Sequence, residues 1–305
     1  MREIASCLSD HSVRVSDYSC TNASNLSCHP PRLPSSIQNA VICTYISKLS
    51  TQKQLLIQLN WSKNALDQGL CIGEIDPENP SSSVSSSVSK FTTQNRLLKK
   101  KKGQRLIEFN SLKVEVLWDL SSAKFSSGPE PVAAFFVAVL IDAEIGLLLG
   151  DMGEDIVHKK FKTGIHLAQF TLISRREHFN GGTLYSTKAQ FSQLGASHDI
   201  AIRCDDEGLK WPALSISIDK RRVILVKRLQ WNFRGNQTIF IDGLTVDLMW
   251  DVYDWLFDRS NNGCASFMFR TRSVLDSRLW LEEKLVVQQE QHRVEFCLFI
   301  SGCKN

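Results

Sequence analysis

One segment of the sequence occurs twice, and this repeat restricts the fold more than any other feature. Residues 102–125 read KGQRLIEFNSLKVEVLWDLSSAKF, and residues 234–257 read RGNQTIFIDGLTVDLMWDVYDWLF, at a constant offset of 250 − 118 = 132 positions. Because far more positions match than chance would produce, we interpret the two segments as copies from an internal duplication. The identical pairs are Gly103/Gly235, Ile107/Ile239, Leu112/Leu244, Val114/Val246, Trp118/Trp250, Asp119/Asp251 and Phe125/Phe257.

Each copy alternates apolar and polar residues with period two, which predicts an antiparallel hairpin with one buried face. In the second copy the turn is Asp242-Gly243, a strong hairpin signal because both residues tolerate positive φ. Asn110-Ser111 occupies the same place in the first copy. Neighbouring strand residues point to opposite faces, so Trp118 is predicted to be core. Asp119 is predicted to bond backbone in the following turn, and the same applies to Trp250 and Asp251.

Other short strand-like runs fill the chain, and helical periodicity is confined to residues 274–291. The sequence therefore predicts an all-β fold with minor α content: an antiparallel sandwich or barrel built from two related halves. Residues 1–38 are predicted to be a disordered tail, 39–150 the first half with a Ser-rich loop at 76–95, and 151–305 the second half. Whether the halves form one domain or two stays open.

The most apolar stretch, residues 131–150, is interrupted by Asp142 and Glu144 and does not provide the roughly 20 apolar residues of a membrane helix. We expect two buried strands instead, at 134–141 and 145–149, and no integral membrane protein. Nine cysteines without any C-x-x-C pair do not indicate zinc. With no apolar core of signal-peptide length at the start, we expect free thiols and an intracellular location, cytoplasmic or nuclear.

The stretches VEVLWDLSSAKFSSGPEP, GLLLGDM, LQWNFRGNQT and VDLMWDVYDWLF resemble a plant-specific family catalogued as domain of unknown function 868. The resemblance runs from about Ala40 to the C-terminal region. It implies a plant protein and supplies no activity, cofactor or catalytic residue.

No sequence motif of a catalytic or nucleotide-binding site is found, and neither a metal nor a cofactor is predicted. The acidic cluster Asp151, Glu154, Asp155 and His158 follows a buried strand, where a solvated turn is the expected structure. His198 and Asp199 are adjacent on a predicted strand and face apart, which disfavours a catalytic pair.

The basic residues Lys99, Lys100, Lys101, Lys102 and Arg105 surround Gly103, as Arg234 precedes Gly235 in the second copy. They are either a solvated turn or a weak anion-binding site for acidic lipid or nucleic acid. The net charge of +4 is too small for a dedicated nucleic-acid binder. We expect a soluble, non-catalytic interaction module that binds another protein or an anionic surface. The alternative is an enzyme, for example a hydrolase, with a pocket between the halves.

Overall fold

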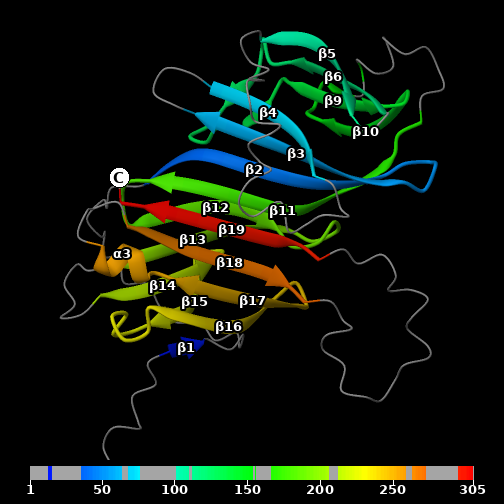
Figure 1. Cartoon of the computed structure of the whole chain (residues 1–305). Helices are drawn as coiled ribbons and strands as arrows, with labels where there is room; N and C mark the ends of the chain where they lie inside the picture. Colours follow the sequence, from blue (N-terminus) through cyan, green and yellow to red (C-terminus); the bar gives the residue numbers. More distant parts are fainter. Residues whose placement is uncertain are drawn as a thin grey trace, which may run out of the picture. The chain divides into compact units, whose positions relative to one another are not determined.

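The structure is a computed structural model, and it describes residues 13–15, 36–63, 68–75, 101–109, 112–153, 155, 166–205, 212–258, 263–272 and 295–304. These residues are almost entirely β-strand (Figure 1), which confirms the predicted fold class. The chain divides into two compact units. We call Gln38–His178 the central unit, and Met1–Ile37 together with Phe179–Asn305 the flanking unit. The division after His178 lies later in the chain than the boundary at residue 150 that the sequence suggested.

The central unit contains two four-stranded antiparallel sheets and a short strand pair. One sheet has the order β10-β9-β6-β5 and the other the order β11-β2-β3-β4. Their bounds are β2 Ile37–Lys48, β3 Gln54–Lys63, β4 Gln68–Ile75, β5 Lys102–Phe109, β6 Leu112–Asp119, β9 Phe136–Ile141, β10 Glu144–Leu149 and β11 Gln169–Asn180, and the short pair is β7 Lys124–Phe125 with β8 Pro131–Ala133.

An apolar core lies between the two sheets of the central unit, and β6, β9 and β10 carry a second buried apolar cluster of Leu117, Phe136, Ala138, Leu140 and Ile145. Leu59 and Trp61 of β3 are buried in the core between the sheets together with Val116 and Trp118 of β6. Along β3 buried inward residues alternate with more exposed ones, whereas β9 is buried along its whole length. The two sheets face each other across this core as in a sandwich, and neither closes into a barrel within the described strands.

The flanking unit also contains two antiparallel sheets, with the orders β1-β15-β14-β13-β12 and β16-β17-β18-β19. Tyr185 and Phe267 join them, with ring centroids 6.2 Å apart, as do Phe191 and Phe269 at 6.3 Å. Their bounds are β1 Val13–Val15, β12 Leu184–Gln190, β13 Ser197–Asp205, β14 Ala213–Ile218, β15 Arg221–Val226, β16 Arg234–Ile241, β17 Leu244–Asp251, β18 Cys264–Thr271 and β19 Cys297–Cys303, and the short helix α3 is Tyr253–Phe257.

The two repeated segments form hairpins with the same register. Gly103 pairs with Trp118 across β5 and β6, and Gly235 pairs with Trp250 across β16 and β17. Both tryptophans are buried, as predicted. Each hairpin is followed by two further antiparallel strands, which gives both units a β-meander of four strands in the same order. The matching topology is what a duplication requires, and a common origin of the halves stays a hypothesis.

The predicted turns are confirmed where the structure describes them. Asp242 and Gly243 have φ of 50° and 74°, so both lie in the left-handed region that a two-residue hairpin requires. The apolar stretch forms buried strands β9 and β10 around a turn at Asp142 and Ala143, also with positive φ. No described helix is long and apolar enough to cross a membrane. The turn Asn110-Ser111, the Ser-rich loop and the helix predicted at 274–291 lie outside the described residues.

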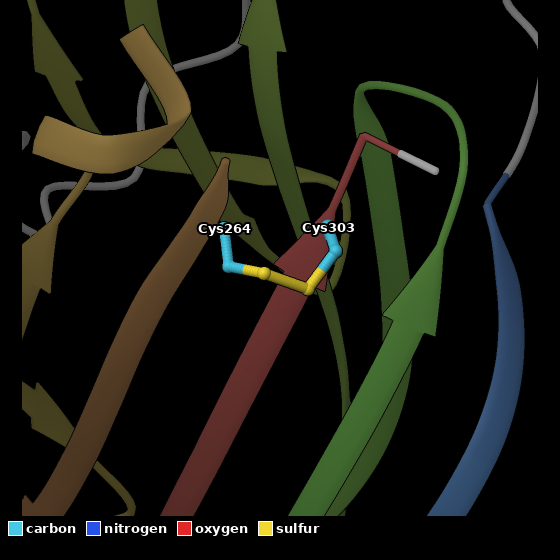
Figure 2. The surroundings of a disulfide bond; sticks show 2 residues. All are labelled: Cys264 and Cys303. Atoms are coloured by element: carbon cyan, nitrogen blue, oxygen red, sulfur yellow. A yellow bond between two sulfur atoms is a disulfide. The ribbon is translucent and has the colours of Figure 1, made fainter. Parts of the chain in front are cut away.

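Two features differ from the sequence predictions. Val13–Val15, within the predicted disordered tail, form β1 and pair with β15; the rest of that tail up to residue 35 lies outside the described residues. Cys264 and Cys303 form a disulfide across β18 and β19 (Figure 2), which contradicts the expectation that all thiols are free. The two cysteines are directly opposite in the register, so their side chains meet although 39 positions separate them. This proximity was hidden because sequence spacing does not reveal strand pairing.

Candidate interaction surface

In both hairpins the chain turns directly after the second strand, next to the aspartate that follows the buried Trp. We call this turn, with the end of the paired strand beside it, the corner of the hairpin. Ser121 donates its backbone N–H to Asp119 Oδ1 at 3.0 Å, and Tyr253 donates to Asp251 Oδ1 at 3.0 Å. Both aspartates therefore bond backbone in the next turn, as predicted. The corner is the same in both units, because Leu120 donates to the carbonyl of Lys101 and Val252 donates to that of Phe233, again at the offset of 132.

The corner of the central unit carries the predicted basic site. Lys102 Nζ lies 2.8 Å from Asp119 Oδ2, and Arg234 Nε lies 2.8 Å from Asp251 Oδ2 at the equivalent place. Burial would raise the pKa of Asp119, but hydrogen bonds from Lys102 and Ser121 outweigh it and lower that pKa. The ion pair of Lys102 with Asp119 in one corner is therefore equivalent to that of Arg234 with Asp251 in the other.

The other members of the basic site are only partly described. Lys101 is exposed at the turn, and Arg105 is partly buried on β5. Lys99 and Lys100 lie outside the described residues. An anion-binding role for these residues therefore stays a prediction, with Lys102 contributing least because its ammonium is already paired.

The corner of the flanking unit is aromatic. Phe233, Tyr253 and Phe257 form a triangle with ring centroids 5.1 to 5.9 Å apart, and the rings of Tyr253 and Phe257 remain 44% and 46% exposed. The guanidinium of Arg234 lies 5.7 Å from the Phe233 centroid and 5.4 Å from that of Tyr253, within cation–π range. The sequence shows these aromatic residues but gives no sign that they are outside the core.

Trp231 lies two positions before Phe233 in the chain and is 78% exposed. We call Trp231, Phe233, Arg234, Tyr253 and Phe257 the aromatic corner. The loop 227–233 that carries Trp231 is tightly bonded: Trp231 N–H donates to Arg228, and the Asn232 side chain donates to the carbonyls of Lys227 and Arg228. Leu229 in the same loop is fully buried. Trp231 is therefore exposed to water on a loop whose position is fixed by these hydrogen bonds and by the buried Leu229.

His198 does not pair with Asp199, in agreement with the sequence prediction, but it makes two other bonds. Its Nδ1 lies 2.6 Å from Asp219 and its Nε2 lies 2.9 Å from Asp242. Burial would lower the pKa of His198, but these two carboxylates outweigh burial and raise it. Because each ring nitrogen lies within hydrogen-bonding distance of a carboxylate, His198 links two hairpin turns.

The acidic cluster after β10 is a turn where the structure describes it. Asp151 accepts the backbone N–H groups of Ala134 and Phe135, and these bonds lower its pKa. Asp155 is exposed, whereas Glu154 and His158 lie outside the described residues. Within the described part of the chain, no three His, Cys, Asp or Glu side chains are grouped to hold a metal ion.

A buried ionic cluster in the central unit was missed by sequence reasoning. Arg175 lies 2.6 Å from Glu130 and 2.5 Å from Glu177, and the latter is completely buried. The buried thiol of Cys43 donates to Glu130, and burial, followed by the charge of Glu130, raises its pKa to about 12. The thiol therefore stays protonated and is a poor nucleophile. In the sequence, this cluster is indicated only by Arg175 and Glu177, which lie two positions apart on one strand and so share a face.

A second polar group joins the β2–β3 turn to β10. Glu144 accepts the backbone N–H and the hydroxyl of Ser50 and contacts His166 Nδ1 at 2.8 Å. Ser50 and His166 each contact the carboxylate, and no Ser–His contact is seen, so the arrangement differs from a Ser–His–acid triad. It fastens a turn.

Residues 36–304 match the model of a family described as plant protein of unknown function (DUF868). The chain belongs to this family. The match covers both units and confirms the resemblance inferred from the sequence, and it assigns no activity to any residue. No curated protein and no solved structure matches the chain.

Proposed function

We propose that this DUF868 member is a non-catalytic, β-rich interaction module whose contact surface is the aromatic corner. The observation that carries the proposal is the exposure of Trp231 on a loop that backbone bonds and a buried leucine hold in place. Tryptophan, tyrosine and arginine are the residues that most often supply binding energy at interfaces. Here one of each is exposed: Arg234 follows Trp231 by three positions, and its guanidinium lies 5.4 Å from the centre of the Tyr253 ring.

The polar clusters of the described residues support the same proposal. His198 uses both ring nitrogens, Arg175 is shared between two glutamates, and Glu144 accepts three hydrogen bonds. These groups are committed to holding turns and strands together. Among the described residues, the two corners combine exposed aromatic or basic side chains, which are groups suited to recognition.

A capture experiment with variants tests the proposal. We expect wild-type protein, immobilised and incubated with plant extract, to retain specific components that Trp231→Ala or Tyr253→Ala protein does not retain. Phe240→Ala is the matched control, because Phe240 is 62% exposed on β16 of the same unit but lies outside the corner. If all variants retain the same components as wild type, the aromatic corner is not the contact surface.

An intracellular location remains part of this proposal, although disulfides such as Cys264–Cys303 persist mainly in oxidising compartments. Imaging of a fluorescent fusion in plant cells tests it. Fluorescence confined to the secretory pathway would contradict the proposed location and would leave the role of the corner unaffected.

A further inference from the structure

We propose that the aromatic corner docks on an anionic lipid surface. This inference rests on the proposed function, since it names the partner of the same surface. It requires three properties of the corner: an apolar group that protrudes, a fixed position for that group, and cations beside it. Each is present in the described residues of the flanking unit.

The protruding group is Trp231. A side chain with 78% of its surface in water stands out from the protein and does not line a groove. Aromatic residues that recognise proline-rich peptides line a groove in which the peptide docks. A convex tip instead fits a broad, soft partner into which it can insert, and the headgroup region of a bilayer is such a partner. Indole rings prefer this region because their apolar body and polar N–H are both accommodated there.

The position of Trp231 is fixed before binding. Leu229 is buried with no exposed surface and donates its backbone N–H to Pro212, which anchors the loop to the start of β14. Trp250 Nε1 donates to the carbonyl of Asn232 at 3.0 Å, which anchors its other end to β17. Little conformational entropy is lost when such a loop inserts, so most of the gain from burying the ring is retained.

Cations flank the indole on the same loop. Lys227 and Arg228 are exposed, and neither forms an ion pair with any described residue. Arg234 is neutralised by Asp251, and the exposed Asp254 on α3 opposes the two cations. The positive charge therefore lies on the loop of Lys227 and Arg228, whereas Asp254 and the partly exposed Asp258 lie on and next to α3. Tyr253 and Phe257, whose rings contact that of Phe233, add partly exposed aromatic surface to the corner.

The test measures binding to vesicles of phosphatidylcholine, alone or mixed with phosphatidylserine. We expect wild-type protein to bind the mixed vesicles more tightly and to lose binding as salt is raised. Trp231→Ala should weaken binding to the mixed vesicles roughly tenfold, because an inserted ring is lost. The double variant Lys227→Gln/Arg228→Gln should weaken it about fivefold for each cation and flatten the salt dependence. Phe240→Ala should bind as wild type does.

Two results would overturn the lipid assignment: no binding of wild type to either vesicle, or equal binding by wild type, Trp231→Ala and Phe240→Ala. The basic residues of the central unit are unchanged in every variant, so binding through them would appear as the second of these results. If wild type does not bind vesicles but its capture of extract components depends on Trp231, the lipid assignment is wrong. The proposed interaction module would then have a protein partner. Failure of both experiments would remove both proposals. Circular dichroism of each variant confirms that the fold is intact.

Discussion

Two glycines make room for the buried tryptophans of the repeated hairpins. A Cβ atom added to Gly103 would lie 2.5 Å from Trp118 Cζ2, and one added to Gly235 would lie still closer to Trp250 Cζ2. Each indole therefore lies flat across the neighbouring strand, and only a residue without a side chain fits beneath it. The identity of these glycines in both copies has a steric cause.

Gly235→Ala should lower the free energy of unfolding by about 1–3 kcal/mol, because the methyl group overpacks the site. Trp250→Ala should lower it by about 3–5 kcal/mol through the cavity that it leaves. Asn236→Ala, at the next and exposed position, is the control and should change stability little. Denaturant unfolding measures all three; a neutral Gly235→Ala variant would show that the indole can move away.

His198 makes the stability of the flanking unit depend on pH. Its pKa is raised by Asp219 and Asp242, so its contribution to stability is fully present below its unfolded pKa and is lost as pH rises through the folded pKa. The melting temperature of wild type should therefore fall with rising pH, over a range that begins near the ordinary histidine pKa of 6.5. Other charged groups face this cluster: Arg221 acts on Asp219, and Lys188 Nζ lies 2.9 Å from Asp199 Oδ1.

His198→Gln should be less stable than wild type at the acidic end of this range and should lose most of the slope. Thermal unfolding followed by circular dichroism at a series of pH values measures both effects. Parallel curves for wild type and His198→Gln would contradict the assignment of the slope to this residue.

At the level of elements, the end of β19 is fastened to its surroundings in three ways. The disulfide joins Cys303 to Cys264 of β18, Lys304 donates its N–H to the carbonyl of Gly263, and Lys304 Nζ lies 4.8 Å from the centre of the Trp255 ring. These contacts tie β18, β19 and α3 into one group. When these contacts are broken, we expect β18, β19 and α3 to unfold together.

Cys303→Ser should lower the free energy of unfolding by about 2–4 kcal/mol, because the reduced chain gains freedom in the unfolded state. Cys297→Ser on the same strand is the matched control, since Cys297 takes no part in the Cys264–Cys303 disulfide. Alkylation of denatured, unreduced protein should leave Cys264 and Cys303 unlabelled. Labelling of both would show that the bond does not form in the protein as isolated.

Strand pairs were predictable where local patterns determine them, and remote contacts were not. The Asp242-Gly243 hairpin and the β9–β10 pair follow from alternation and from turn residues. The bonds of His198 to Asp219 and Asp242 join turns 21 and 44 positions away, so no local pattern predicts them. The aromatic corner was missed for another reason: a period-two pattern does not say which aromatic residues lie beyond the end of the strand.

For the molecule as a whole, the basic site of the central unit is a second candidate for contact with anions. Because Lys102 is paired with Asp119, the informative variant changes Lys99, Lys100 and Lys101 to Gln and keeps Lys102. Binding to vesicles containing phosphatidylserine should weaken by about fivefold for each lysine that reaches the surface. Unchanged binding to such vesicles and to nucleic acid at low salt would show that these lysines form only a solvated turn.

The pairing of β1 with β15 has a consequence for the time at which the protein folds. Val13 lies opposite Val226, and the central unit occupies most of the chain between them. A ribosome that adds about 5–20 residues per second needs roughly 10–40 seconds to make this interval. During that time β1 has emerged and has no strand to join, while the central unit can already assemble its own sheets. The order of synthesis therefore favours completing the inner part of the chain before the segment that precedes it finds its place.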